Sequence, residues 1–201
     1  MTLPKDLFRG RRIGILGGSF NPAHEGHRHI SLYALKMLRL DEVWWMVSPQ
    51  NPLKSTRDMA PLHQRIQSAL DASHHPRIRV TDIEQYLNTR YTSDTLKKLK
   101  TLYPDTDFVW LMGTDNLRQI HRWQEWQDIF KTVPVCVLDR PPRGNSIKST
   151  PAALRFSAFQ HPQEHAASIV TAKTPAWTLL HIPLNNLSAT AIRQGLINAK
   201  H

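Results

Sequence analysis

The chain has 201 residues, of which 40% are hydrophobic and 21% are charged, and its formal net charge is +10. This composition fits one domain with a real core and excludes a disordered chain. No apolar run is long enough to cross a membrane, and residues 1–12 lack the apolar region and cleavage site of a signal peptide. We therefore expect a cytoplasmic protein, without a membrane partner, that forms a single domain over residues 1–201.

Apolar runs alternate with helical patterns along the chain. Strands are expected at 12–17, 42–48, 78–83, 107–113, 133–138 and 177–182. Helices are expected at 26–40, 61–73, 93–102, 123–130 and 189–198. This alternation predicts an α/β fold, a doubly wound parallel sheet with helices on both faces. In such folds the site lies beyond the carboxyl ends of the strands.

Two features complete the outline of the chain. The segment 141–175 is rich in proline and lacks clear periodicity, so we expect a surface excursion with some helix rather than a separate domain. Cys136, the single cysteine, lies in an apolar run, which excludes a disulfide within the chain and favours a buried core thiol.

The positive charge has two interpretations, a nucleic-acid surface or a site for small polyphosphates. The basic residues are scattered rather than gathered in a block, so composition alone does not decide between them. A non-catalytic RNA-binding module needs aromatic platforms interleaved with a basic face. The tryptophans instead fall at predicted strand and helix positions, which favours an enzyme with anionic substrates and no nucleic-acid partner.

The most informative segment joins the first predicted strand to the first predicted helix, and it reads GGSFNPAHEGH, residues 17–27. Gly17 and Gly18 permit a sharp turn and bring backbone N–H groups close to a ligand. The helix start that follows adds unpaired N–H groups and the positive end of the dipole, which suits phosphate. Its spacing is neither that of the Walker lysine motif nor that of the dinucleotide fingerprint.

His24 and His27 are three residues apart, so they share a face if the helix begins near His24. Their imidazoles can then donate to phosphate oxygens, while Gly26 leaves room for a nucleotide. Histidines at a helix start are more often capping or surface residues. A metal site is a weaker alternative, because two ligands are too few, and no metal-binding residues are assigned.

The segment Leu187–Arg193 opens the last predicted helix. Ser188 is a good cap, and Thr190 and Arg193 share a face of the first turns, where they can hold phosphate. Taken alone, this pattern is more often an ordinary capped helix with a solvated arginine.

The segment 17–27 resembles the HxGH signature of the nucleotidyltransferase superfamily, which is related to class I aminoacyl-tRNA synthetases. The chain is similar in particular to bacterial nicotinate-nucleotide adenylyltransferases over residues 13–195, apart from 141–175. The resemblance implies a Rossmann-like fold. It also implies transfer of AMP from ATP to nicotinic acid mononucleotide in NAD biosynthesis, with Mg²⁺ bound to ATP.

Further segments carry the resemblance. Leu187–Arg193 is similar to the family's second ATP-phosphate motif, with Ala189 in place of a common serine. Residues 91–96 (YTSDTL) resemble the segment that lines the mononucleotide site, and Trp123 matches the tryptophan that stacks on the pyridine ring. The resemblance implies ATP binding by Gly17, Gly18, Ser19, Phe20, His24, Gly26, His27, Gly113, Asp115, Ser188, Thr190 and Arg193. It implies mononucleotide binding by Asn51, Lys54, Tyr91, Thr92, Trp123 and Arg140.

We expect the acceptor's phosphate to attack the α-phosphate of ATP directly, with His24, His27, Lys54 and Arg193 stabilising the charge that builds. For Trp123 core packing is the alternative, and for Lys54 and Arg140 a solvated position. Phosphopantetheine and nicotinamide mononucleotide remain alternative acceptors. A homodimer is the candidate assembly, although the chain stops soon after the final motif, where many relatives continue with another helix.

Overall fold

The computed structural model describes residues 5–49, 59–139 and 147–183. The strands are β1 Arg12–Gly18, β2 Glu42–Val47, β3 Ile78–Thr81, β4 Asp107–Gly113, β5 Val135–Asp139, β6 Gln160–His161 and β7 Trp177–His181. The α-helices are α1 Glu25–Met37, α2 Leu62–Ser73, α3 Ile83–Tyr86, α4 Thr92–Leu102, α5 Thr114–Gln119, α6 Trp126–Thr132 and α7 Pro151–Arg155. The 3-10 helices are η1 Lys5–Phe8, η2 Ile120–Arg122, η3 Ser157–Phe159 and η4 Gln163–Thr171.

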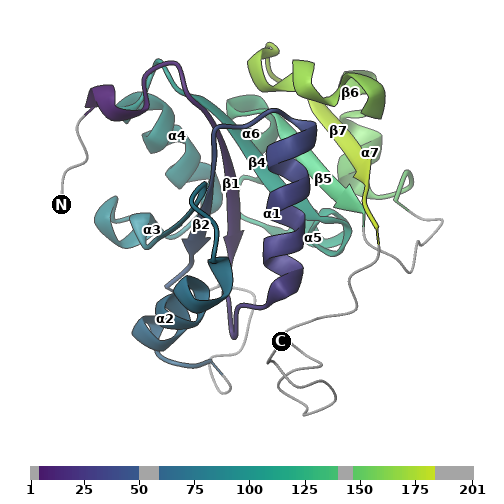
Figure 1. Cartoon of the computed structure of the whole chain (residues 1–201). Coiled ribbons are helices and arrows are strands. Elements are labelled where there is room, and N and C mark those ends of the chain that lie inside the picture. Colours follow the sequence, from purple (N-terminus) through teal and green to yellow (C-terminus); the bar gives the residue numbers. More distant parts are fainter. Residues whose placement is uncertain (1–4, 50–58, 140–146, 184–201) are drawn as a thin grey trace.

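The described strands form one seven-stranded sheet in the order β3-β2-β1-β4-β5-β7-β6. Every pairing is parallel, so all carboxyl ends lie at one edge. β1 pairs with β2 on one side and with β4 on the other, and the strand order therefore reverses between β1 and β4. A reversal of this kind opens a crevice at the carboxyl edge. In Figure 1 the turn from β1 into α1 lies at the lower end of the sheet, which is this edge.

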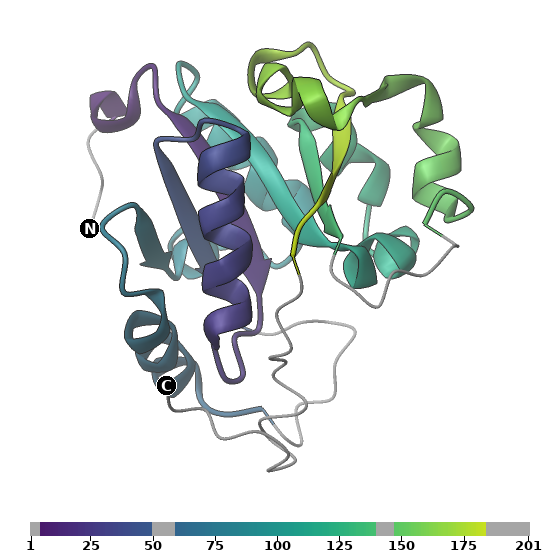
Figure 2. The ribbon, with the colours of Figure 1, turned by 45° about the vertical axis from the view of Figure 1, so that its right-hand side comes forward.

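Two apolar clusters cover the two faces of the sheet, because successive side chains of a strand point to opposite faces. In β1, Ile13 and Ile15 join the cluster under α4, α5, α6 and α7, whereas Leu16 joins the cluster under α1, α2 and η4. Figures 1 and 2 show α1 in front of the strands, with α4 and α6 behind them in Figure 1. The predicted doubly wound parallel sheet is confirmed.

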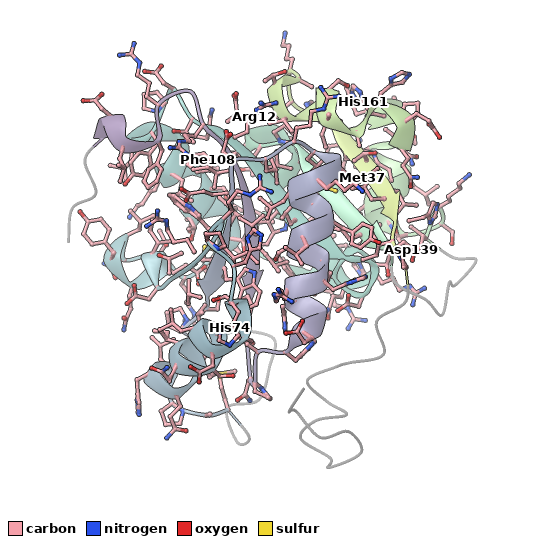
Figure 3. All side chains as sticks on the ribbon, viewed as in Figure 1. Arg12, Met37, His74, Phe108, Asp139 and His161 are labelled. Atoms are coloured by element: carbon pink, nitrogen blue, oxygen red, sulfur yellow. The ribbon has the colours of Figure 1, made fainter. Side chains whose placement is uncertain are left out.

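Side chains on all elements are drawn in Figure 3, where the labels orient the sheet. Arg12 and Phe108, near the starts of β1 and β4, lie at the upper end of the view, and Asp139, the last residue of β5, lies lower down.

Helix boundaries differ from the predictions where the backbone turns left-handed. The first helix was expected to reach residue 40 but ends at Met37, because Arg39 has φ +52°. The helix expected at 123–130 begins only at Trp126, because Glu125 has φ +46°. The strand expected at 78–83 ends at Thr81, and α3 follows. The sequence patterns did not predict α3, α5 or the 3-10 helices.

The segment expected to be a surface excursion contributes to the core over residues 147–171. Strand β6 pairs with β7, and buried side chains enter both apolar clusters. The segment was expected to lie on the surface, because its short helical turns bury single residues and therefore leave no periodic apolar pattern in the sequence. These residues are Ile147, Ala152, Ala153, Phe156, Ala166, Ile169 and Val170.

Three further sequence expectations concern membrane spans, Cys136 and the last helix. Within the described residues, no helix combines the length and the apolar character that crossing a bilayer requires. Cys136 is buried as predicted, and desolvation raises the pKa of its thiol far above the ordinary value. The helix expected at 189–198 lies outside the described residues.

Candidate active site at the carboxyl edge of the sheet

Gly17 and Gly18 end β1, and their surroundings differ. A Cβ atom on Gly17 would lie 2.3 Å from Cη2 of Trp110 on β4, so close packing between the strands requires glycine there. A Cβ atom on Gly18 would come no closer than 3.4 Å, to the ring of Phe20. Packing within the described protein therefore does not require glycine at Gly18.

Ser19 and Phe20 follow β1 in the segment that leads to α1. Phe20 adopts φ +46°, and its ring is buried between His27 and Trp45, at centroid distances of 4.7 Å and 5.2 Å. Only the backbone of Phe20 is thus available to a ligand. Ser19 is also buried, and its Oγ has no hydrogen-bond partner among the described residues.

His24 and His27 form a capping box at the start of α1. The N–H of Gly26 donates to Nδ1 of His24 at 3.0 Å, and the N–H of His24 donates to Nδ1 of His27 at 3.3 Å. An Nδ1 that accepts carries no proton, so a neutral ring holds its proton on Nε2. Capping uses Nδ1 of each ring, so it is compatible with the expectation that Nε2 donates to phosphate.

The first helix begins beside His24, as the shared-face argument requires. His24 is its N-cap, and the ring centroids of His24 and His27 are 4.0 Å apart. Acceptor nitrogens at a helix start satisfy N–H groups that lack partners in the helix. The sequence thus places two imidazoles together at the end of β1.

Gly113 and Asp115 lie at the end of β4, beside β1. Gly113 is the N-cap of α5, and Asp115 is an exposed residue in the first turn of that helix. A carboxylate in this position can accept hydrogen bonds from ribose hydroxyls.

The segments expected to bind the acceptor lie close together. Tyr91 is the N-cap of α4 and Thr92 its first residue, and both are partly exposed. The hydroxyl of Ser93 donates to the carbonyl of Gln124 at 3.4 Å, which joins the start of α4 to the residue after Trp123.

The two neighbouring tryptophans differ in their contacts. Trp123 is partly exposed and makes an edge contact with Trp110, with the ring centroids 6.4 Å apart. Trp126 instead packs edge-on against Phe130 and Phe156. Both rings are partly buried against the same apolar cluster, and they differ in which aromatic side chains they contact.

Six of the predicted site residues lie outside the described residues. They are Asn51, Lys54, Arg140, Ser188, Thr190 and Arg193.

The comparisons with known proteins agree on one family. A family model described as cytidylyltransferase-like matches residues 15–195. A protein of Cereibacter sphaeroides named "Probable nicotinate-nucleotide adenylyltransferase" is 52% identical over 181 residues, covering 90% of this chain and 96% of that protein. A protein of Rhizobium johnstonii with the same name is 44% identical over 187 residues, covering 93% of this chain and 94% of its own length. The chain belongs to the nicotinate-nucleotide adenylyltransferases.

A solved structure gives the same fold for a more distant nucleotidyltransferase. It is described as Plasmodium falciparum nicotinic acid mononucleotide adenylyltransferase complexed with NaAD. It superposes with a TM-score of 0.67 at 20% identity, over 95% of this chain and 86% of that one. The Rossmann-like nucleotidyltransferase fold expected for this adenylyltransferase is thereby confirmed.

Sequence reasoning missed two buried charged residues of this adenylyltransferase that both bond to Ser48, at the end of β2. Arg65 on α2 is 2% exposed, and burial lowers the pKa of its guanidinium. Its spacing of four from Ala69 and eight from Ser73, both buried, places it on the inward face of α2. Glu84 on α3 is 3% exposed, and burial raises the pKa of its carboxyl. No pattern in the sequence distinguishes Glu84.

A third missed feature lies at the same edge, beside β7. Asp139 ends β5 with 2% exposure, and its Oδ2 lies 3.0 Å from Nδ1 of His181. The pair links the ends of β5 and β7.

Proposed function

We propose that this adenylyltransferase transfers the AMP part of ATP to nicotinic acid mononucleotide, which releases pyrophosphate and forms nicotinic acid adenine dinucleotide for NAD biosynthesis. The observation that carries the proposal is the histidine capping box, which presents two imidazoles together at the carboxyl end of β1. The names of the relatives point to the same reaction.

The reaction needs no covalent enzyme intermediate. An oxygen of the acceptor's phosphate forms a bond to the α-phosphorus of ATP, the bond from that phosphorus to the bridging oxygen breaks, and pyrophosphate leaves with the electron pair. The attacking oxygen is already anionic, so no general base is required. The protein must hold two anions in line and stabilise the charge that builds.

We expect this requirement to be met at the glycine turn. The Nε2–H groups of His24 and His27 donate to the phosphates of ATP, and Gly17 and Gly18, which have no side chains, let the phosphates approach the main chain closely. Donors that are fixed before the reaction begins cost no reorganisation during it. The backbone near Ser19 and Phe20 and the space at Gly26 complete the phosphate turn, and Gly113 and Asp115 face the nucleoside.

The acceptor binds where α4 begins and Trp123 is partly exposed. Its pyridine ring stacks on Trp123, and Tyr91 and Thr92 line the same place. The contact between Ser93 and Gln124 supports this arrangement, because it holds the two segments together. Asn51, Lys54 and Arg140 on the acceptor side, and Ser188, Thr190 and Arg193 on the ATP side, remain part of the proposal.

Mg²⁺ fits this site as an ion carried by ATP. The described residues bring no three histidine, cysteine, aspartate or glutamate side chains together, so they form no cage of protein ligands. Mg²⁺ keeps several waters and binds substrate phosphates readily, with one or two carboxylates at most. When bound, it neutralises part of the charge on the phosphates. A cytoplasmic location and a homodimeric assembly are also parts of the proposal.

An acceptor panel tests the function. Purified protein is incubated with ATP, Mg²⁺ and one acceptor at a time: nicotinic acid mononucleotide, nicotinamide mononucleotide or phosphopantetheine. Pyrophosphate release is measured and the dinucleotide product is identified by mass. Fastest release with nicotinic acid mononucleotide is expected. Faster release with another acceptor would assign that acceptor instead, and salt-sensitive RNA binding without any release would favour the RNA-binding alternative.

A further inference from the structure

Ser48, directly after β2, makes hydrogen bonds in three directions. Its N–H donates to the carbonyl of Gly18 at 2.9 Å, and its own carbonyl accepts from Nη1 of Arg65 at 2.7 Å. Its hydroxyl donates to Oε2 of Glu84 at 2.6 Å. Ser48 therefore contacts the turn after β1 (residues 17–20, the phosphate turn), the buried guanidinium of Arg65 and the buried carboxyl of Glu84.

Arg65 holds the phosphate turn through further hydrogen bonds. Its guanidinium also donates to the carbonyls of Ser19 at 2.7 Å, Pro49 at 2.8 Å and Ala60 at 2.9 Å. Ser19 belongs to the turn after β1, and Pro49 continues the chain after β2. The planar fork of arginine makes several such bonds at once, which lysine cannot reproduce.

The Glu84 side leads to the acceptor segment. Oε1 of Glu84 lies 3.4 Å from the hydroxyl of Thr95 in α4. The N–H and the hydroxyl of Thr95 both lie 3.0 Å from the carbonyl of Tyr91, the N-cap of that helix. The N–H of Thr89 also donates to the carbonyl of Glu84 at 3.0 Å. Glu84 is thus bonded both to the end of β2 and to the start of α4.

We propose that Ser48, together with Arg65 and Glu84, forms a positioning network that couples binding of ATP at Gly17–Gly18 to binding of the acceptor at Tyr91–Thr92. This inference rests on the proposed function for the identity of the two substrates. The contacts run from the carbonyl of Gly18 through Ser48 to Glu84, whose Oε1 lies near the hydroxyl of Thr95, and the main-chain N–H of Thr95 donates to the carbonyl of Tyr91. The hydroxyl of Thr95 also lies 2.8 Å from the hydroxyl of Thr89, so Glu84 and Thr89 share it.

The chemistry explains why such coupling is useful. In-line transfer requires the acceptor's phosphate and the α-phosphate to be aligned closely, and a misplacement of about 1 Å costs about 100-fold in rate. The two substrates contact different strands and helices, so their alignment depends on what joins those elements. Ordering of the turn by ATP restrains Ser48, and Ser48 in turn restrains Glu84 and the start of α4.

The test measures how each ligand changes the affinity for the other. The dissociation constant of nicotinic acid mononucleotide is determined by calorimetry with and without α,β-methylene-ATP, an analogue whose α,β link resists transfer. In the wild type the analogue is expected to tighten acceptor binding by about 5-fold or more, and the reciprocal experiment should give the same factor. In Ser48→Ala and Glu84→Gln the factor should fall towards one.

Matched variants control for general loss of stability. Ser73→Ala removes a buried hydroxyl that donates to Leu70 at the far end of α2, and Glu42→Gln alters a carboxylate at the opposite end of β2. Both controls should keep the wild-type factor. A purely structural role would reduce the melting temperature and the active fraction without changing this factor or the KM values. If Ser48→Ala does not fold, Glu84→Gln and Arg65→Lys carry the test.

Two results would overturn the inference. One is a wild type that makes the dinucleotide but binds the two ligands independently. The other is wild-type coupling in the folded Ser48→Ala, Glu84→Gln or Arg65→Lys variants. Failure of the proposed function is a separate result, because it would appear as a wild type that forms no dinucleotide in the acceptor panel.

Discussion

His24 and His27 cap α1 reciprocally, each ring accepting a main-chain N–H through Nδ1, with ring centroids 4.0 Å apart. In each ring, Nδ1 stabilises the start of the helix, whereas Nε2 is the nitrogen proposed to bind phosphate. Substitutions can separate the two roles.

Replacing His24 by asparagine or by alanine makes this separation. Asparagine is a good N-cap, so His24→Asn should keep the stability of the fold, whereas His24→Ala should lose about 1 kcal/mol. Both should lose about 100-fold in turnover, because one fixed donor to the phosphates is removed. Thermal unfolding and pyrophosphate release are measured on the same samples. Normal turnover of a folded His24→Asn protein would refute the donor role.

The two glycines of the turn should respond differently to alanine. Gly17→Ala forces a Cβ against Trp110 and should destabilise the fold by about 1–3 kcal/mol. Gly18→Ala meets only ordinary contacts, so it should unfold like the wild type but show a raised KM for ATP.

A second substitution controls the steric argument. Trp110→Phe in the Gly17→Ala background removes the clashing atoms and should restore part of the lost stability. Denaturant unfolding checks this expectation, and equal destabilisation by Gly17→Ala and Gly18→Ala would contradict it.

Trp123 and Trp126 offer a matched pair of aromatic substitutions. Trp123→Ala should raise the KM for the acceptor about 10-fold, because stacking of an aromatic base on such a ring contributes about 1–3 kcal/mol. Trp126→Ala should instead lower stability, since its ring packs against Phe130 and Phe156. Steady-state kinetics at varied acceptor and varied ATP distinguish the two, and an unchanged acceptor KM in Trp123→Ala would rule out stacking.

Glu84 should make stability depend on pH in a defined direction. Burial raises the pKa of its carboxyl above the ordinary value of 4.5, despite opposing hydrogen bonds from Ser48 and Thr95. Between 4.5 and the raised pKa, the folded state binds more protons at this group than the unfolded state does. Its contribution to stability is therefore present at low pH and is lost as pH rises through the folded pKa.

The comparison with Glu84→Gln isolates this effect, since glutamine does not titrate. The free energy of unfolding of the wild type relative to Glu84→Gln should fall as pH rises from 4.5 through the raised pKa, and then stay constant. Denaturant titrations at a series of pH values measure the difference. A difference that grows in favour of the wild type over this range would contradict the prediction.

The sheet could be predicted from sequence because each central strand is a run of apolar residues that is buried on both faces. Phe108, Trp110 and Met112 pack on one side of β4 and Val109 and Leu111 on the other, which leaves an uninterrupted apolar segment to read. The glycine turn and the two histidines were readable for a related reason. Their spacing is tied to the start of one helix, so local geometry determines their relation.

Contacts between residues that are far apart in the sequence could not be predicted from local patterns. Arg65 is buried by carbonyls of residues up to 46 positions away, and backbone carbonyls leave no signature in side-chain identity. Glu84 joins two elements through Ser48 and Thr95, which are 36 and 11 positions away. The short α5 and the two-residue β6 are below the length at which a periodic pattern can be recognised.

The outermost strands of the described sheet, β3 and β6, are also its shortest, with four and two residues. A short edge strand offers few unpaired N–H and C=O groups to another chain. The strand of a second molecule therefore cannot readily pair with it and extend the sheet. A pair of subunits would therefore meet through helices or loops rather than through a joined sheet.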